Sequence, residues 1–387
     1  MDPANRIERT AMTLNRVEQN DPALTYLKVS NSGRIIRGGT GYYCPNDTAG
    51  LARLGVAIGT NTNLRSLSIR NTHALADMAA NNVSFFEGLN NNTSIRRLAI
   101  ANCDLSAGMG RDILNEVVAN NTNLTSITLI RCTLGNGGTG VLTSAVTRCT
   151  NLADIGLLSC SIDDDILADF VSGIRGCHQL NVLDLSMNNF GRAGCEALAT
   201  MLNDPNGNLR SLNLRNNNRI DDNCATILAN SLKGNRKLRT MGLHGRAMPI
   251  TESGWDAFSR VLCNTSSINA TSLSNHTLRV LRAVNLPTIL TSLLNLNIGR
   301  NKKQVAVQKI LRSHPHLDME PFLEWDLKVL PLAVSWFDQA RYHAQNDQSA
   351  IDAKKLSAIN HFVRALPMMF VPPPSKETNK RKIGEVN

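Results

Sequence analysis

The chain has 387 residues, of which 42% are hydrophobic and 4% aromatic, and its formal net charge is +10. This apolar content excludes an intrinsically disordered chain, and no stretch approaches the roughly 18 consecutive apolar residues of a transmembrane helix. The N-terminus is polar rather than signal-like, and the nine cysteines are an odd number. We therefore predict a soluble protein with reduced thiols, located in the cytoplasm or the nucleus and not on a membrane.

The first predicted element is a helix over residues 3–19. Its apolar side chains recur at helical spacing from Ile7 to Val17. A stack of repeats needs a cap at each end, because its terminal repeats otherwise expose core leucines. We therefore assign residues 1–20 to an N-terminal helical cap of the repeats that follow.

Residues 21–279 contain a short apolar pattern that recurs at nearly constant intervals. One copy reads Leu152, Ile155, Leu157, Cys160 and Ile162. The copies begin with Leu64, Ile95, Leu124, Leu152, Leu180, Leu209, Leu238 and Ile268. Successive copies are thus 28 to 31 residues apart. An earlier copy begins at Leu24, 40 residues before Leu64, which indicates an insertion around residues 38–47.

Each copy matches the leucine-rich-repeat line and predicts a strand followed by a helix. Apolar and polar residues alternate in its first part, which is the period of a strand with one buried face. About 17 residues remain for the return path, in which Val141, Leu142, Ala145 and Val146 have helical spacing. We predict an α/β leucine-rich-repeat solenoid, a horseshoe with parallel strands on its inner curve and helices outside.

Beyond residue 279 the pattern stops and helical spacing follows. We predict one helix that begins at Pro287 and another over residues 302–313. These helices belong to a predicted C-terminal helical cap over residues 280–370, which would cover the last repeats.

Residues 371–387 are rich in proline and then in charge, which predicts a disordered basic tail. The run Lys380-Arg381-Lys382 in this tail has two interpretations. It is either a nuclear-import signal or a solubilising cluster, and the sequence leaves both open.

Seven cysteines recur in three positions of the repeat. Cys103, Cys132 and Cys160 share the position normally held by asparagine, Cys149 and Cys177 share a second, and Cys195 and Cys224 share a third. The chain has no CxxC or HxxxH spacing, so nothing in it indicates convergent metal ligands. We predict buried structural thiols, no metal and no cofactor.

The repeat lines resemble the ribonuclease-inhibitor-like class of leucine-rich repeats, which includes ribonuclease inhibitors, Ran GTPase-activating proteins and the sensing ends of NOD-like receptors. The resemblance covers about residues 20–280 and implies a protein-binding solenoid. The chain lacks the dense cysteine lattice and acidic face of ribonuclease inhibitors, and the acidic tail of the Ran activators. Its last third is similar to large, mostly uncharacterised repeat proteins of unicellular eukaryotes, which imply no activity.

If the inner face binds a partner, the contacts come from side chains that point out of the strands, away from the leucines. Most of these are small, which lets a partner approach closely, and Ile130 with Leu158 forms an apolar pair. The candidate partner-binding residues are Arg70, Arg97, Thr128, Ile130, Asp154, Leu158, Asp184, Ser186, Asn213, Arg215 and His244. The alternative is that these positions are simply solvated.

A second candidate surface is basic, because no acidic residue occurs between Asp256 and Asp318. Its residues are Arg279, Arg282, Arg300, Lys302, Lys303, Lys309 and Arg312. Such a surface favours an anionic protein or simple solubility. Nucleic-acid binding through residues 279–312 is a further alternative, although Phe258 is the one aromatic residue nearby, so stacking platforms are missing.

No catalytic motif is present. The eight histidines do not lie in a recognisable arrangement with a nucleophile or a carboxylate, and no phosphate-binding glycine loop occurs. We therefore expect a non-enzymatic scaffold for protein–protein interaction. The alternative that the class resemblance suggests is an activator of a small GTPase of the Ran type. The sequence specifies neither the partner nor the oligomeric state.

Overall fold

The computed structural model describes residues 3–30, 41–45, 47–70, 83–106, 121–245, 248–298 and 301–314. The chain divides into two compact units. The first comprises Met1–Asn264 and Leu273–Gly299, and the second comprises Thr265–Ser272 and the residues from Arg300 onward. The repeat pattern lies mainly in the first unit.

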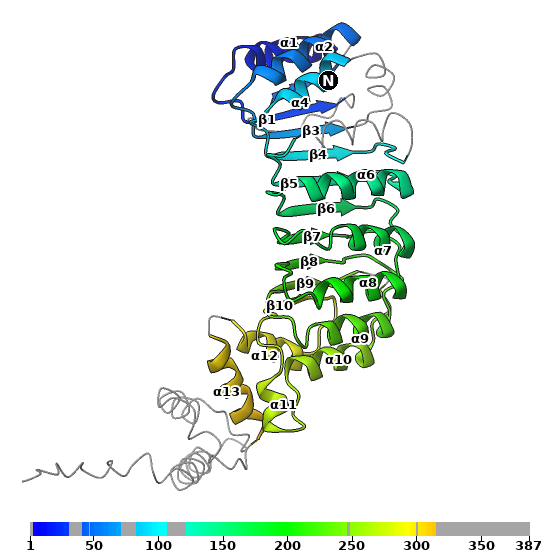
Figure 1. The fold of residues 1–387 in the computed structure, drawn as a ribbon, viewed down its shortest axis with the longest axis vertical. Helices are drawn as coiled ribbons and strands as arrows, with labels where there is room; N and C mark the ends of the chain where they lie inside the picture. Colours follow the sequence, from blue (N-terminus) through cyan, green and yellow to red (C-terminus); the bar gives the residue numbers. More distant parts are fainter. Residues whose placement is uncertain are drawn as a thin grey trace, which may run out of the picture. The chain divides into compact units, whose positions relative to one another are not determined.

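The described part of the first unit forms one parallel sheet of ten strands, in the order β10-β9-β8-β7-β6-β5-β4-β3-β1-β2 (Figure 1). The strands are β1 Tyr26–Ser30, β2 Gly41–Tyr43, β3 Ser66–Arg70, β4 Arg97–Ala101, β5 Ser126–Ile130, β6 Asp154–Leu158, β7 Val182–Asp184, β8 Ser211–Asn213, β9 Thr240–Gly242 and β10 Val280–Arg282. From β3 to β10 the strands neighbour one another in chain order, as a repeat array requires.

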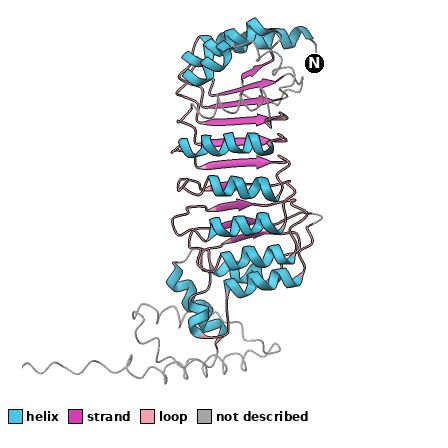
Figure 2. Ribbon diagram, turned by 45° about the vertical axis from the view of Figure 1, so that its right-hand side comes forward, coloured by secondary structure: helices cyan, strands magenta, loops and turns pink. Residues whose placement is uncertain are grey.

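Helices connect the strands and lie along the sheet side by side (Figure 2). In the first unit they are α1 Pro3–Glu18, α2 Thr48–Thr60, α4 Val83–Asn91, α6 Gly135–Arg148, α7 Asp164–Gly173, α8 Arg192–Leu202, α9 Asp222–Ser231, α10 Glu252–Leu262 and α12 Thr288–Leu296. The second unit contains α11 Ile268–Ser272 and α13 Lys302–Ser313, which contact each other. The prediction of a parallel strand–helix repeat is confirmed, whereas the horseshoe curvature stays a prediction.

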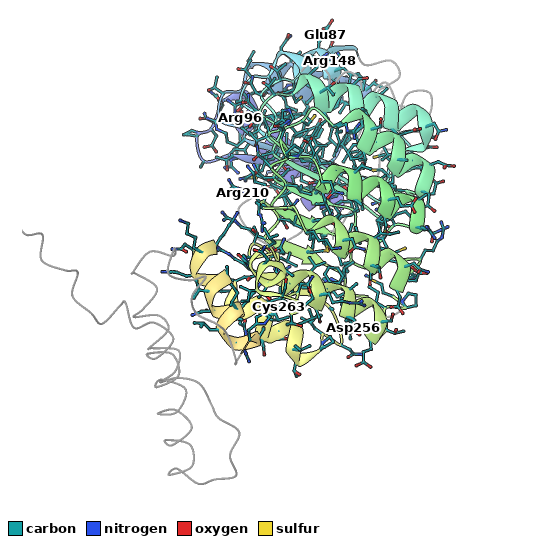
Figure 3. All side chains as sticks on the ribbon, turned by 60° about the horizontal axis from the view of Figure 1, so that its bottom comes forward. Glu87, Arg96, Arg148, Arg210, Asp256 and Cys263 are labelled. Atoms are coloured by element: carbon teal, nitrogen blue, oxygen red, sulfur yellow. The ribbon has the colours of Figure 1, made fainter. Side chains whose placement is uncertain are left out.

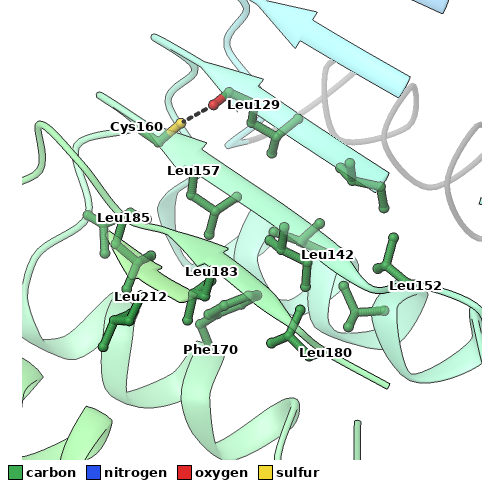
Figure 4. Close-up of a cluster of buried hydrophobic side chains, with 14 of the residues drawn as sticks. Leu129, Leu142, Leu152, Leu157, Cys160, Phe170, Leu180, Leu183, Leu185 and Leu212 are labelled. Atoms are coloured by element: carbon green, nitrogen blue, oxygen red, sulfur yellow. Dashed lines mark hydrogen bonds between the residues drawn. The ribbon is translucent and has the colours of Figure 1, made fainter. Parts of the chain in front are cut away.

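The core of the first unit lies between the sheet and the helices (Figure 4). Leu157 and Leu183 reach it from neighbouring strands, and Leu142 and Phe170 reach it from α6 and α7. All four side chains are at most 1% exposed. Each contributes about 1.5 to 3 kcal/mol by leaving water, and because the pattern recurs, the core continues from one repeat to the next.

A ladder of asparagine and cysteine side chains joins neighbouring repeats after strands β5 to β8. The amide nitrogen of Asn188 donates to the carbonyl of Leu157 at 2.7 Å, and its oxygen accepts from the backbone nitrogens of Cys160 and Ile162. Cysteine replaces asparagine in earlier repeats, where Cys160 Sγ donates to the carbonyl of Leu129 at 3.5 Å (Figure 4). The predicted buried, structural position of this cysteine is confirmed.

The N-terminal end of the sheet contains an extra strand. β2 pairs with β1 on the side away from β3, so the 40-residue interval between the first two copies holds an inserted edge strand. Helix α1 packs on β2 and α2. The helix predicted over residues 3–19 and the insertion predicted at 38–47 therefore both occur near the expected positions.

The C-terminal end of the sheet differs from the predicted one. Residues from Ile268 form the helix α11 rather than a strand, and the next strand is β10, in which Leu281 pairs with Met241 of β9. The sheet thus extends to Arg282, beyond the predicted boundary of the repeats at residue 279. The side chain of Asn275 accepts from the backbone nitrogen of Leu278 at 2.9 Å, which fixes the loop that enters β10.

The helices expected after the repeats occur in part. Helix α12 begins after Pro287, and α13 coincides with the helix predicted over residues 302–313. The remainder of the predicted cap and the tail over residues 371–387 lie outside the described residues. No helix in the described residues is both long enough and apolar enough to cross a membrane.

Candidate functional site

The sheet has an open face, which we define as the side opposite the helices and the core. Its central file contains one outward side chain from each strand. In sheet order these are Tyr42, Lys28, Ser68, Ala99, Thr128, Gly156, Asp184, Asn213, Gly242 and Arg282. The strand register places these residues side by side, as the repeat spacing predicts.

The open face is buried at its N-terminal end. Lys28 and Ser68 are 6% and 1% exposed, and the Lys28 ammonium lies 5.7 Å from the centre of the Tyr42 ring. Burial, and then the positive charge of Arg70, lowers the pKa of Lys28. Arg70 is half-buried and donates to Ser68 Oγ at 3.3 Å. This end offers little surface to a partner.

The middle of the open face carries the second group of predicted binding residues. Arg97 and Asp154 are exposed, but β5 separates their strands, so their backbones are about 10 Å apart and they do not share one charged spot. Ile130 and Leu158 are register partners and half-buried, and thus form the expected apolar pair. Thr128 lies beside them and is half-buried.

A hollow of about 180 Å³ opens on this face over the last four strands. Its lining residues are Val182, Asp184, Ser211, Leu212, Asn213, Thr240, Gly242 and Arg282. A Cβ atom at position 242 would lie 2.6 Å from Asn213 Oδ1, so a side chain there would displace the Asn213 amide. The hollow gathers Asp184 and Asn213 from the predicted set and adds residues that the sequence did not single out.

Hydrogen bonds fix the acidic side of the hollow. Asp184 Oδ2 accepts from Asn213 Nδ2 at 2.9 Å, and Asp184 Oδ1 accepts from the backbone nitrogen of Ser186 at 2.9 Å. Ser186, predicted as a contact residue, is itself only 4% exposed. The carboxylate of Asp184 is thus engaged within the protein, and Ser186 supports it rather than facing a partner.

Arg282 on β10 is the basic residue among those that line the hollow, and Arg215 and His244 follow the ends of β8 and β9. Arg215 and Arg282 are exposed, and His244 lies half-buried where both act on it. Desolvation, followed by the charges of these two arginines, lowers the pKa of His244. Its Nδ1 is buried and has no hydrogen-bond partner in the described residues, so no acceptor there stabilises the imidazolium. The imidazole is therefore neutral at pH 7.

The predicted basic surface is divided. Arg279 and Arg282 belong to the first unit, and the exposed residues Lys302, Lys303 and Arg312 belong to α13 of the second. The placement of Lys309 on this surface is wrong, because its side chain is fully buried in α13. Arg300 lies outside the described residues.

An arginine recurs at one position of the repeat, a pattern that the sequence-based predictions did not include, although they named Arg279. It follows the first leucine or isoleucine of the line in five repeats, at Arg65, Arg96, Arg210, Arg239 and Arg279. Figure 3 shows Arg96 and Arg210 on the same side, away from Asp256 of α10. The signal is readable as N-x-x-L-R or N-x-x-I-R in the sequence.

Three of these arginines directly precede the last three strands, and we name Arg210, Arg239 and Arg279 the arginine row. The carbonyl of Arg210 accepts from the backbone nitrogen of Arg239 at 2.8 Å, and that of Arg239 accepts from Arg279 at 2.8 Å. Their backbones are therefore about 4.8 Å apart. Their guanidinium groups make no hydrogen bond or ion pair with the described part of the chain.

Burial and thiol hydrogen bonds raise the pKa of five of the seven recurrent cysteines, whereas a hydrogen bond with Cys195 lowers the pKa of Cys224. Burial raises the pKa of Cys160 to about 11 and also raises that of Cys149. A hydrogen bond with Cys103, followed by burial, raises the pKa of Cys132. Thiols of this kind stay protonated at neutral pH, whereas nucleophiles and metal ligands must be thiolates.

No family model matches the sequence, and no curated protein matches it. A solved structure described as leiomodin-1 actin-binding site 2 resembles the chain, with 12% sequence identity. The match covers 78% of this chain and 96% of that chain, with a TM-score of 0.23. At this TM-score the match supports no argument about function.

Proposed function

We propose that the chain is a non-catalytic repeat scaffold that binds a protein partner on the open face, over strands β7 to β10. The observation that carries this proposal is the hollow, which lies on the face that the helices leave uncovered and is lined from four consecutive strands. Exposed apolar atoms of Val182 lie beside polar groups of Asn213 and Ser211 there. Interfaces combine such apolar contact with a few placed hydrogen-bonding groups.

The arrangement suits binding better than a reaction. The carboxylate of Asp184 is held by two hydrogen bonds, and the buried thiols of Cys132, Cys149 and Cys160 have raised pKa values. Neither feature supplies a nucleophile with an adjacent base. The alternative of a small-GTPase activator stays a sequence-based prediction, for which single-turnover GTP hydrolysis with and without the chain is the test.

The proposal predicts that filling the hollow abolishes partner capture. We expect Ser211→Trp to place an indole over Asn213 and to reduce the recovery of cellular partners at least about tenfold, because bulk at the centre of an interface excludes the partner. The measurement is quantitative proximity labelling in the native cell, with the variant and the wild-type chain expressed equally.

The matched control is Ser126→Trp, since Ser126 occupies the same repeat position on β5 and is also half-buried. This variant should retain the partners of the wild-type chain. Equal recovery with wild type and Ser211→Trp, from variants with the same thermal unfolding midpoint, would exclude the hollow as the binding surface.

A further inference from the structure

We infer that the arginine row and the basic groups beside the hollow bind an acidic segment of the protein partner. This inference rests on the proposed function, because it names the chemistry that the same surface recognises. The occupant is a stretch of polypeptide with closely spaced aspartate or glutamate side chains, in extended conformation across β8 to β10.

The first support is the unrelieved charge of the arginine row. Like charges on directly adjacent strands repel each other, and no acidic side chain in the described residues relieves this repulsion. Arginines at the same repeat position near the other end of the sheet are different. Arg65 donates to the carbonyl of Thr62 at 2.7 Å, and Arg96 donates to that of Thr93 at 2.6 Å. The guanidinium groups of the row thus make no bond with the described residues, whereas Arg65 and Arg96 each use one nitrogen on a nearby carbonyl.

The second support is the distribution of charge around the hollow. The arginine row stands where strands β8 to β10 begin, Arg282 lines the hollow itself, and Arg215 follows the end of β8. Positive groups thus lie on both sides of any chain that crosses these strands. Successive side chains on one side of an extended peptide are about 6.8 Å apart, so neighbouring carboxylates reach different arginines.

The one acid of the hollow does not neutralise these groups. Asp184 and Arg282 lie in the central file on β7 and β10, three strand spacings or about 14 Å apart. The Asp184 carboxylate accepts instead from Asn213 and from the backbone of Ser186. The positive end therefore remains available to a carboxylate from outside.

The same face argues for a polypeptide rather than a nucleic acid. Asp154 and Asp184 point out of β6 and β7 and would repel a continuous phosphate backbone running along the sheet. The outward strand positions from β7 to β10 carry no aromatic ring, so bases would find no stacking platform in this described part of the chain. Guanidinium groups suit carboxylates well, because both are planar and pair through two hydrogen bonds.

The test is fluorescence polarisation with the full chain and a short labelled peptide of alternating glutamate and glycine. We expect saturable binding that weakens as sodium chloride is raised, and no binding of the matching glutamine–glycine peptide. Replacing the row by Arg210→Gln, Arg239→Gln and Arg279→Gln together should weaken binding at least about tenfold, through the loss of three charge-assisted contacts. The control, Arg65→Gln with Arg96→Gln, should bind like wild type.

Three results would overturn the inference: absent binding of the acidic peptide, unchanged binding by the triple variant, or tighter binding of a labelled oligouridylate than of the peptide. The outcome is separable from that of the proposed function. Loss of cellular partners with Ser211→Trp but not with the triple variant leaves the hollow as the binding surface and removes the arginine row from it. Binding of the acidic peptide to the row, together with normal partner capture by Ser211→Trp, keeps the arginine row as a binding site and excludes the hollow as the partner-binding surface.

Discussion

Asparagine and cysteine form different hydrogen bonds at the ladder position. Asn188 donates to one neighbouring repeat backbone and accepts from Cys160 and Ile162. A thiol donates weakly and has no comparable acceptor. Cysteine fills the position in repeats where such a nitrogen has another acceptor, as when the backbone nitrogen of Leu105, equivalent to that of Ile162, donates to the carbonyl of Thr133 at 2.7 Å.

This difference predicts that Asn188→Cys is destabilising. Two buried backbone nitrogens lose their acceptor, which costs about 2 to 3 kcal/mol of unfolding free energy. Urea unfolding measures the change, and a shift of the midpoint without a change of slope shows that stability alone has altered. Cys160→Ser keeps a donor at the equivalent position and should cost less than about 1 kcal/mol. An Asn188→Cys chain as stable as wild type would contradict the role of the ladder.

The second prediction at this scale concerns His244. Its pKa should lie below the ordinary value of about 6.5, because burial and the charges of Arg215 and Arg282 disfavour the imidazolium. The unfolded chain then binds more protons than the folded one. His244 therefore costs no stability above pH about 6.5 and destabilises the fold as the pH falls below it.

An NMR titration of the His244 ring protons measures this pKa directly. Arg282→Gln should raise it, and Arg192→Gln, an exposed change on α8, should leave it unaltered. A His244 pKa that does not respond to Arg282→Gln would contradict the placement of the three basic groups together.

At the scale of elements, pairs of neighbouring helices differ in how closely their backbones approach each other. α2 and α4 meet at Gly55 and Gly88, where a Cβ atom on Gly88 would overlap the carbonyl of Gly55. Elsewhere an aspartate links consecutive helices. Asp222 of α9 accepts from the backbone nitrogens of Thr251 and Gly254 at 2.7 and 3.2 Å, at the start of α10. Contact between backbones joins the first pair, and end-capping joins the second.

The close approach predicts that Gly88→Ala destabilises the protein. Backbone atoms cannot rotate away from the new methyl group, so the two helices must separate, which costs about 1 to 3 kcal/mol. The higher helix propensity of alanine offsets about 1 kcal/mol of this cost. Gly140→Ala on α6 is the matched control. A Cβ atom there has open space, and the variant should be up to about 1 kcal/mol more stable in thermal or urea unfolding. Equal stability of the two variants would show that the contact imposes no constraint.

At the scale of the whole molecule, much of the strand order was predictable because each repeat carries its own pattern. The strands from β3 to β9 begin within the predicted lines, and the helix over 302–313 follows from its spacing alone. β10 was missed because 40 residues, rather than about 29, separate it from β9. Asn275 three residues before Leu278 was the available signal, since Asn92 precedes Ile95 in the same way.

The candidate site was less predictable than the strands around it. Single residues such as Asp184, Asn213 and Arg215 followed from alternation along each strand. The hollow depends instead on neighbours across strands, above all on the absence of a side chain at Gly242 beside Asn213. Lys309 is a residue whose exposure was predicted wrongly, because helical spacing placed it on a surface and the packing of α13 buries it. Such relations arise only when the repeats are stacked.

The parallel register has an evolutionary consequence. Each strand under the hollow contributes one to three lining residues and pairs only with its immediate neighbours, so the cavity is assembled from separable genetic modules. Duplication of one module between β8 and β9 would lengthen it by about 4.8 Å and leave every other module intact. Recognition in such a chain can therefore diversify by copying a segment, without redesign of the rest.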